Sequence, residues 1–336
     1  YDKVKAAGID VIIAAATAVD PEKRTVTLAG GSTLLAYDRL VVSPGIDFRP
    51  GFVPGYDRSA AEAMPAAFNN AAEIMVLRRQ LEAMADGGTV VITSPVNPAR
   101  CPPAPYERAS LIAHYLKSRK PRSKVIVLDQ KENFTMQKLF EAAWQELYPG
   151  LIEWVGLSNG GALSQIEASS KTISTDFDKY QAAVASIIPT QKAGRAADLA
   201  HVADRTGWCP VDPLTFESKL QKNIHVIGDA AIAGAMPRSA SAAQSQSRIC
   251  AAAIAALFAG TIALTVQWTD AQGQARATTV SQVIRHAVPT VTFSPSAPAT
   301  GQTVNVSLNS PGASTFVFWL NGIVVPGSGA TRSFTD

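Results

Sequence analysis

The chain has 336 residues, of which 47% are hydrophobic and only 17% are charged, so it can bury a core large enough for two or three domains. Its 30 basic and 27 acidic residues give a formal net charge of +3 and form no basic block, which argues against a nucleic-acid partner. The longest apolar run, residues 251–264, is shorter than the ~20 residues that a membrane-spanning helix needs. We interpret this run as a buried helix that leads into a strand.

Short strands are expected first along the chain. Apolar stretches alternate with turn residues from Val11–Ala15 to Leu40–Ser43, and the last of them ends at Pro44-Gly45. This pattern predicts a small antiparallel meander that leads into a buried strand. Because the sequence opens at Tyr1, without Met or a signal-like segment, we expect an N-terminal part to precede it.

A helix and a βαβ unit are expected next. Residues 60–85 carry apolar side chains at helical spacing and stop at Gly87-Gly88, which predicts a helix followed by a strand. The β-branched run Thr89–Thr93, a proline-rich loop, a helix over residues 106–118 and a strand over residues 124–128 then follow in order. This order indicates two parallel strands joined by a right-handed crossover.

Beyond that unit, a helix is expected over residues 137–147 and a buried strand over Ile224–Ile227. The strand ends in Gly228-Asp229, and an Ala/Ser-rich helix over residues 239–257 follows. An acidic residue at the carboxyl end of a strand lies where an open α/β sheet binds its ligand, so Asp229 is a candidate site residue. The alternative is that Asp229 only caps the next helix.

The composition changes after about Gly260, where Thr, Ser, Val and Pro become dominant. Strand-like segments are expected at residues 290–294, 303–308 and 315–320, with turns at residues 309–312 and at Asn321-Gly322. This pattern is typical of an antiparallel sandwich of the immunoglobulin-like kind, although the ~50 residues after Pro289 are fewer than the ~100 of a complete sandwich. We therefore expect a β-rich segment that is shorter than a whole module.

The loop of the βαβ unit argues against a nicotinamide cofactor. A dinucleotide pyrophosphate needs glycines there, so that backbone N–H groups can approach it at the helix N-terminus. Residues 94–105 contain no glycine and five prolines, each of which removes an N–H donor. NAD(P)H is therefore not expected to bind, although Asp129 ends the second strand where a ribose-binding acid would lie.

Two of the three cysteines are followed by proline in motifs with a family likeness. Residues 100–110, Arg-Cys-Pro-Pro-Ala-Pro-Tyr-Glu-Arg-Ala-Ser, contain Cys101, and residues 207–212, Gly-Trp-Cys-Pro-Val-Asp, contain Cys209. Both motifs resemble the flavoprotein subunit of flavocytochrome c sulfide dehydrogenase. Further resemblance to this disulfide-reductase-like group of FAD flavoproteins runs through residues 37–45, 187–194 and 236–239. Without these flanking matches we would favour two unrelated buried thiols, and Cys250 keeps that interpretation.

The resemblance implies an α/β fold with two Rossmann-like domains of the FAD/NAD(P)-binding type, each with a parallel sheet, before the all-β immunoglobulin-like segment. It divides the chain into the first part of an FAD domain (1–83), an inserted Rossmann-like domain (84–188), the second part of the FAD domain (189–260) and the β-rich segment (261–336). The FAD domain's first βαβ unit, with its pyrophosphate loop, and the cysteine that tethers the flavin are expected before Tyr1.

The resemblance also implies the site and its chemistry. Cys101 and Cys209 take the role of a redox-active disulfide over the flavin, and Arg100 is expected to favour the reacting thiolate. The residues implied to bind FAD are Gly45, Gly228, Asp229, Pro237, Arg238 and Ser239. Sulfide is the implied substrate and a cytochrome c subunit the implied acceptor. A disulfide of this kind persists in an oxidising compartment, which indicates the periplasm.

Some positions depart from the family's pattern. Ala104 stands where the family usually has Gly, residues 240–244 read Ala-Ser-Ala-Ala-Gln in place of Gly-Tyr-Ser-Ala-Asn, and no C-terminal flavin-binding segment is recognisable after residue 260. Two alternatives stay open. One is a sulfide:quinone reductase-like enzyme, which an amphipathic C-terminal membrane anchor would favour. The other is a non-catalytic remnant fused to an adhesive β-sandwich module, which purification without a flavin spectrum would favour.

Overall fold

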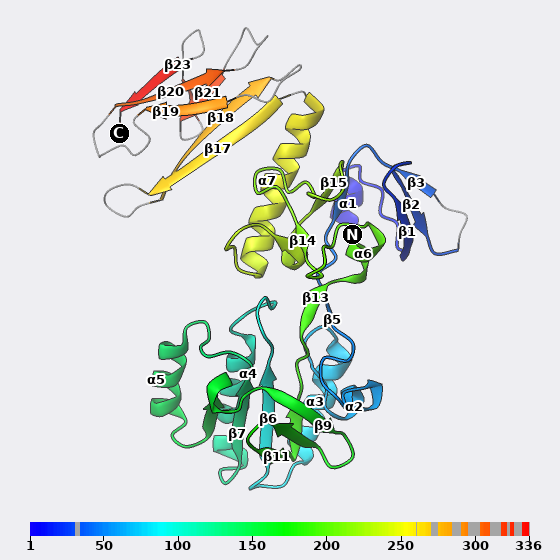
Figure 1. Ribbon diagram of the computed structural model, residues 1–336, viewed down its shortest axis with the longest axis vertical. Coiled ribbons are helices and arrows are strands. Elements are labelled where there is room, and N and C mark those ends of the chain that lie inside the picture. Colours follow the sequence, from blue (N-terminus) through cyan, green and yellow to red (C-terminus); the bar gives the residue numbers. More distant parts are fainter. Residues whose placement is uncertain are drawn as a thin grey trace.

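The computed structural model describes the backbone of residues 1–30 and 34–259 and, beyond them, seven strands between Thr261 and Thr335. Side chains are described for residues 1–30 and 34–258. Figure 1 shows two α/β bodies joined by the strands β5 (Ile46–Phe48) and β13 (Gln191–Ala193), which pair antiparallel.

A four-stranded parallel sheet lies in the lower body of Figure 1. Its strands are, in order across the sheet, β12 (Val184–Ser186), β6 (Thr89–Ser94), β7 (Lys124–Asp129) and β8 (Ile152–Val155). β6 and β7 are buried at nearly every position, because parallel strands of this kind are covered on both faces and are built from β-branched and other apolar residues. The helix α4 (Ala104–Arg119) connects β6 to β7, so the predicted βαβ unit is confirmed.

A helix and a small antiparallel sheet complete the lower body. The helix α5 (Gln137–Leu147) has the bounds that the sequence predicts, and the 3-10 helix η1 (Leu157–Asn159) follows β8. The sheet consists of β9 (Leu163–Glu167), β10 (Thr172–Thr175) and β11 (Lys179–Gln181). Ile166 and Ile173 lie opposite each other across β9 and β10, and both pack into the core under the parallel sheet.

The upper body in Figure 1 is built from two distant stretches of the chain. Its strands β4 (Leu40–Val42) and β15 (Ile224–Val226) pair parallel, and β14 (Cys209–Pro210) pairs parallel with β16 (Ala231–Ile232). The short elements α6 (Arg195–Leu199) and η2 (Gly228–Ala230) lie between these strands in the sequence. One core joins the two stretches, with the buried side chains of Val42, Ile46, Trp208, Phe216 and Val226 among its members.

A three-stranded antiparallel meander precedes the upper body's core, after the short helix α1 (Asp2–Ala6). Its strands are β1 (Ala16–Asp20), β2 (Thr25–Leu28) and β3 (Leu34–Ala36). The meander is confirmed, but the expectation of a strand at Val11–Ala15 is wrong, since the first strand begins only at Ala16 and Ile13 is 87% exposed. The Asp20 carboxylate accepts the N–H groups of Glu22 and Lys23, and this turn ends β1 and leads the chain into β2.

Residues 60–85 form two helices where the sequence predicts one. The helix α2 (Arg58–Ala63) ends just before Pro65, and α3 (Ala71–Ala83) begins after Asn70, whose side chain accepts a first-turn N–H. Proline cannot continue a helix, and an asparagine cap starts a new one, so the local chemistry overrides the apolar spacing. Buried apolar residues on the predicted face are Met64, Leu77 and Met84.

The buried apolar residues form three clusters, one in the upper body and two in the lower. Residues 53–84 contribute to both lower clusters: Val53, Ala60 and Met64 to one, and Ala67, Leu77 and Met84 to the other. This stretch therefore packs with the parallel sheet of residues 89–186. The domain boundaries given above, at residues 83, 188 and 260, remain a prediction.

The helix α7 (Ala240–Ala259) leads into β17 (Thr261–Thr269), as predicted for residues 251–264. The remaining strands are β18 (Ala275–Val283), β19 (Thr290–Ser294), β20 (Thr303–Asn309), β21 (Val317–Leu320), β22 (Ile323–Val325) and β23 (Thr331–Thr335). They form two antiparallel sheets, and β19, β20 and β21 match the three predicted strands. The predicted turns at residues 310–312 and 321–322 lie outside the described residues, and the immunoglobulin-like character stays a prediction.

Candidate functional site

Two turns from distant parts of the chain lie at the same sheet edge. β4 and β15 are parallel neighbours, so Gly45 and Gly228-Asp229 both follow their carboxyl ends, as the sequence predicts. Gly228 has a φ of +79°, and a Cβ added there would lie 3.3 Å from the hydroxyl of Ser43, so the two turns are in contact. Gly45 has a φ of +64° and open space on its Cβ side. This edge is where open α/β sheets bind ligands.

Asp229 connects this edge to both cysteine motifs. Its carboxylate is 3.2 Å from Nε of Arg100, the residue before Cys101. Its main-chain oxygen accepts a hydrogen bond from Nε of Arg238 at 2.8 Å. The Asp229 side chain therefore binds the cysteine loop of the lower body, and in the part of the chain that the structure describes the helix that follows, residues 240–259, is capped by Ser239 and not by Asp229.

Arg238 lies between the two cysteine loops. Its main-chain oxygen accepts the N–H of Cys101 at 2.8 Å. Its guanidinium lies 4.1 Å from the ring centroid of Trp208, the residue before Cys209, in a cation–π contact. Cys101 and Cys209, which are far apart in the sequence, are therefore both adjacent to Arg238.

The backbone at Cys101 is in an uncommon conformation. Its φ is +49°, in the left-handed region, where a residue with a Cβ is strained by about 1–3 kcal/mol. Such strain persists only where surrounding contacts hold it, and here the N–H of Cys101 bonds to Arg238 while its carbonyl accepts the N–H of Ala104. The loop thus holds Cys101 in one defined position.

All three cysteines are free thiols in this structure, so it does not contain the disulfide expected between Cys101 and Cys209. Cys101 is half-buried, whereas Cys209 and Cys250 are buried. Burial raises the pKa of Cys209 to about 12, with Asp198 and Asp204 adding to the rise and Arg238 opposing it. Burial alone raises the pKa of Cys250 to about 11, in keeping with an inert thiol inside α7.

The expectation that Arg100 favours a Cys101 thiolate is confirmed for Arg100 itself, but the net shift of the pKa of Cys101 runs the other way. Arg100 does lower the pKa of Cys101, but burial and the nearby Glu107 carboxylate outweigh it, and Asp229 opposes it further. The pKa of Cys101 is therefore raised. The sequence shows the adjacent arginine, whereas burial and the acids from other elements follow only from the fold.

The segment Pro237-Arg238-Ser239 leads into the N-terminus of α7. The Ser239 hydroxyl accepts the N–H of Ala242 at 3.2 Å, so Ser239 caps the helix. Gln246, farther along α7, accepts the N–H of Gly228 at 2.6 Å. The start of α7 is therefore held at the edge formed by the turns after β4 and β15.

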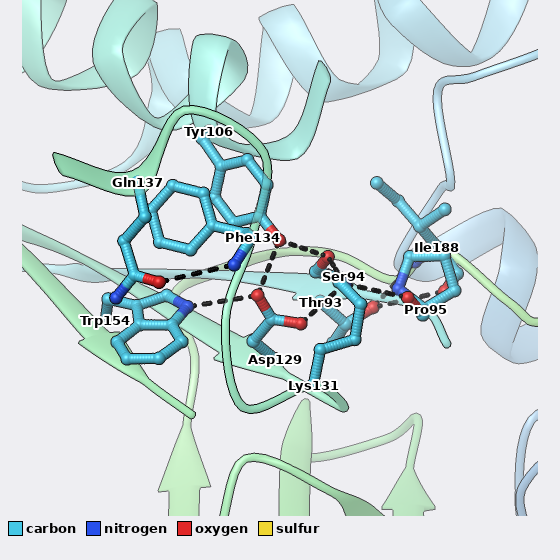
Figure 2. Close-up of polar contacts among 10 residues, drawn as sticks. All are labelled: Thr93, Ser94, Pro95, Tyr106, Asp129, Lys131, Phe134, Gln137, Trp154 and Ile188. Carbon is cyan, nitrogen blue, oxygen red and sulfur yellow. Dashed lines mark hydrogen bonds and ion pairs between the residues drawn. The ribbon is translucent and has the colours of Figure 1, made fainter. Parts of the chain in front are cut away.

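A second polar cluster lies at the carboxyl ends of β6 and β7 (Figure 2). The Asp129 carboxylate is fully buried and accepts hydrogen bonds from the Tyr106 hydroxyl at 2.5 Å, Lys131 Nζ at 2.6 Å and Trp154 Nε1 at 3.0 Å. Burial lowers the pKa of Lys131, while the Asp129 charge opposes that shift. The buried carboxylate is thus balanced by a partly buried ammonium.

Lys131 also fixes the loop that carries Cys101. Besides Asp129, its ammonium donates to the Ser94 hydroxyl at 2.7 Å and to the Pro95 main-chain oxygen at 2.9 Å (Figure 2). Asp129 lies where a ribose-binding acid would lie, but its oxygens already bond to protein donors. This arrangement supports the prediction that NAD(P)H does not bind.

The sequence analysis missed several residues of these clusters. Trp208 and Lys131 left a weak signal, because each lies within two positions of a residue that was singled out, Cys209 and Asp129. Tyr106 belongs to the matched motif but had no assigned role. Gln191 lies in the matching segment 187–194 but had no assigned role, and Trp154 left no local signal, since its partner Asp129 comes from another strand.

The described residues offer no metal site or membrane span. No group of three or more His, Cys, Asp or Glu side chains in this part of the chain could hold a metal ion. Within the same part, no helix combines the length and the apolar character needed to cross a bilayer.

Comparison with protein families identifies the central region. Residues 74–189 match the family model described as the central part of the flavoprotein chain of sulfide dehydrogenase [flavocytochrome c]. The chain resembles a flavocytochrome c sulfide dehydrogenase flavoprotein. The resemblance predicted from the cysteine motifs is therefore confirmed, and the matched region contains Cys101, the proline-rich loop and the Asp129 cluster.

Solved structures show the same fold at low identity. The ferredoxin reductase of the CYP199A2 system from Rhodopseudomonas palustris is 15% identical, with a TM-score of 0.56 over 93% of this chain and 73% of that chain. The water-forming NADH oxidase from Lactobacillus brevis is 15% identical, with a TM-score of 0.53 over 90% and 68%. The NAD-dependent persulfide reductase from A. fulgidus is 14% identical, with a TM-score of 0.55 over 93% and 60%. These matches confirm an α/β fold with parallel sheets.

Proposed function

We propose that this chain is an FAD-dependent oxidoreductase that oxidises sulfide through a redox pair formed by Cys101 and Cys209. The observation that carries the proposal is the position of Arg238, whose main chain binds Cys101 and whose guanidinium lies on Trp208, next to Cys209. The family match over residues 74–189 supports the same assignment.

The residues of the upper edge fit part of an FAD site. Gly45 has open space beside it, Gly228 lies against the neighbouring turn, and α7 directs its capped N-terminus to the same edge. A helix N-terminus stabilises negative charge, which suits a reduced flavin. When bound, FAD supplies an acceptor that takes two electrons and releases them singly. Asp229, Pro237, Arg238 and Ser239 are the further residues that we assign to its binding.

The protein's part in the reaction is thiol–disulfide chemistry. The sulfur of hydrosulfide forms a bond to one cysteine as the Cys101–Cys209 bond breaks, which leaves a persulfide on one residue and a thiolate on the other. The sulfide sulfur loses two electrons and the disulfide gains them, so the step is balanced without another reactant. Arg238 stabilises a thiolate at Cys209, since its charge already lowers the pKa of that thiol.

The electron acceptor and the compartment follow from the family likeness. We propose a cytochrome c subunit as the partner that takes the electrons, because the matching family is a flavocytochrome c. We propose the periplasm as the compartment, because an oxidising environment maintains a reactive disulfide. A sulfide:quinone reductase-like enzyme and a non-catalytic remnant stay as alternatives.

The test is sulfide-dependent reduction of cytochrome c by the purified protein supplied with FAD. We expect activity in the wild type and in Cys250→Ser, and a loss of at least about a hundredfold in Cys101→Ser and Cys209→Ser, since each removes the disulfide that sulfide attacks. Purified protein that takes up FAD but gives the same rate in all four forms would contradict the redox pair. Protein without a flavin spectrum or activity would favour the non-catalytic remnant.

A further inference from the structure

A cavity separate from the cysteine loops lies between α5 and β8. β8 is the outer strand of the four-stranded parallel sheet and pairs with β7. The volume of the cavity is about 370 Å³, within the range of roughly 300–1,000 Å³ that is usual for small-molecule sites. A ligand of several heavy atoms therefore fits. The residues that line the cavity include Glu141, Trp144, Gln145, Tyr148, Ile152 and Trp154.

Aromatic rings form much of the wall, and the polar atoms of both indoles are already bonded. Trp144 Nε1 donates to Ser110 Oγ at 2.8 Å. Trp154 Nε1 donates to the Asp129 carboxylate at 3.0 Å (Figure 2). The ring of Phe134 packs against both indoles, with its centroid 6.0 Å and 5.4 Å from theirs. The indoles are therefore held in place, and they offer a ligand carbon surface and π electrons in place of N–H donors.

The charge that faces the cavity is negative. Glu141 is the one charged residue that lines it. Its Oε1 accepts Gln137 Nε2 at 2.8 Å, and Gln137 Oε1 accepts the N–H of Phe134 at 3.3 Å, so the carboxylate is held toward one side of α5. Among the residues that the structure describes, no basic side chain forms an ion pair with Glu141. Its charge is therefore available to a ligand.

One cation already lies near the aromatic wall. Lys117 Nζ, from α4, is 6.0 Å from the centroid of the Tyr148 ring, at the outer limit of a cation–π contact. This ammonium donates to the main-chain oxygen of Leu147, and Lys117 does not line the cavity. A ligand would share the Tyr148 ring with Lys117, so Trp154 and Glu141 carry most of its recognition.

We propose that this cavity binds a small organic cation with a methylated ammonium head, such as that of choline. The methyl groups contact the rings of Tyr148 and Trp154, and the positive charge faces the Glu141 carboxylate. A quaternary ammonium has no N–H group to satisfy, so aromatic rings and one carboxylate are enough for it. A metal ion needs several oxygen ligands, and an anion would be repelled by Glu141. The site is independent of the proposed redox reaction, since no residue of the cysteine loops lines it.

Calorimetric titration of the full chain at constant ionic strength tests the site. Choline should bind saturably. Its uncharged carbon analogue, in which a tert-butyl group replaces the trimethylammonium group, should bind at least about tenfold more weakly. Glycine betaine keeps the head but adds a carboxylate, and Glu141 should make it bind more weakly than choline. Equal binding of choline and the carbon analogue, or no saturable binding of choline, overturns the proposal.

The matched variants are Glu141→Gln and Glu146→Gln, both on α5. Glutamine at position 141 keeps an acceptor for Gln137 and removes the charge, so the affinity for choline should fall at least about fivefold. Glu146 is exposed and does not line the cavity, so its variant should bind choline like the wild type. Tyr148→Leu replaces an aromatic wall by an apolar one, and should weaken the binding of choline but not that of the carbon analogue. Unchanged choline affinity in both Glu141→Gln and Tyr148→Leu overturns the site.

The same head group occurs in free small molecules and in trimethylated lysine side chains. A peptide that contains trimethyllysine, titrated in the same way, distinguishes these two sources. Tighter binding of choline assigns the site to a free cation, and tighter binding of the peptide assigns it to a methylated side chain. Both results support the methylated ammonium as the group that the cavity recognises, whereas equal binding of the peptide with unmodified lysine overturns it.

Discussion

Arg238 holds the site together through one main-chain contact and two contacts of its guanidinium. Its main chain binds the N–H of Cys101, its Nε donates to the main chain of Asp229, and the face of its guanidinium covers Trp208. Lysine could supply the charge but neither the flat face nor the in-plane donor. The motif containing Arg238 was found by resemblance, whereas its contacts with both cysteine loops could not be predicted, since they depend on how two distant segments fold back.

The raised pKa of Cys209 makes the stability of the reduced protein depend on pH. The folded thiol has a pKa of about 12 against an ordinary value of 9.0, so above pH 9 the unfolded chain loses its proton first. The stabilisation is complete below pH 9 and is lost as the pH rises from 9 to 12. We expect urea denaturation of the reduced protein to give a steeper fall in the free energy of unfolding between pH 8 and 10 for the wild type than for Cys209→Ser. An equal dependence of the free energy of unfolding on pH in the two proteins would contradict this prediction, because their other titrating groups are the same.

At the scale of elements, the ends of β6, β7 and β8 are joined by one buried ion pair. Asp129 on β7 binds Tyr106 on α4 and Trp154 on β8, and Lys131 ties the same carboxylate to the loop after β6. A crossover unit with a glycine-rich loop leaves this region open for a dinucleotide. Here protein side chains fill the polar positions, and the loop they hold carries Cys101.

The substitution Asp129→Asn should therefore destabilise the protein strongly. It would leave the partly buried ammonium of Lys131 without its counter-charge, and removing one partner of a fully buried pair costs about 3–5 kcal/mol, so we expect a loss of up to that size. Glu153→Gln, which breaks the exposed pair with Lys124 at the neighbouring strand, is the control and should have a much smaller effect. Urea denaturation measures both changes. Similar losses of stability in the two variants would contradict the prediction that the Asp129–Lys131 pair contributes more to folding than the exposed Glu153–Lys124 pair.

The same edge gives an expectation about nicotinamide cofactors. The first turn of α4 includes Pro105, its N-cap position is Pro103, and no side chain caps it, so few N–H donors face a pyrophosphate. Calorimetric titration with NADH and NADPH should give no heat of binding at micromolar concentrations. Micromolar binding of either cofactor would contradict this expectation, because it would require the loop after β6 to break its hydrogen bonds with Lys131.

Elements with strong local signals were predicted well, and elements set by a single residue were not. The periodic run of α5 and the β-branched strands β6 and β7 carry their signal along their whole length. The break between α2 and α3 depends on Pro65 and the Asn70 cap, and the end of β1 depends on the turn at Asp20. Apolar spacing alone cannot resolve such local choices, because a side chain can be apolar and still lack a partner strand.

At the scale of the molecule, the fold places one cysteine motif in each body. Cys101 follows the parallel sheet of the lower body and Cys209 begins β14 in the upper body, while β5 and β13 run between the bodies (Figure 1). The antiparallel pairing of β5 with β13 is one connection, and the contacts of Arg238 and Asp229 with the Cys101 loop are another. The parallel sheets were foreseeable from the order of elements, whereas this joint was not, because it depends on residues separated by more than a hundred positions.

Hydrogen exchange should show that the strands differ in how strongly their amides are protected. Amides of β6 and β7 lie in the middle of a four-stranded sheet and are almost wholly buried, so they should exchange only through global unfolding of the lower body. β3 is an edge strand of the meander with all three residues exposed, and its amides should exchange through local opening with a much lower free energy. Exchange followed by peptide mass spectrometry should therefore order the segments as β3 first, the β4–β15 pair later, and β6 and β7 last. Uniform protection of β3 and β7 would contradict this order, since it would require the meander to unfold only together with the central sheet.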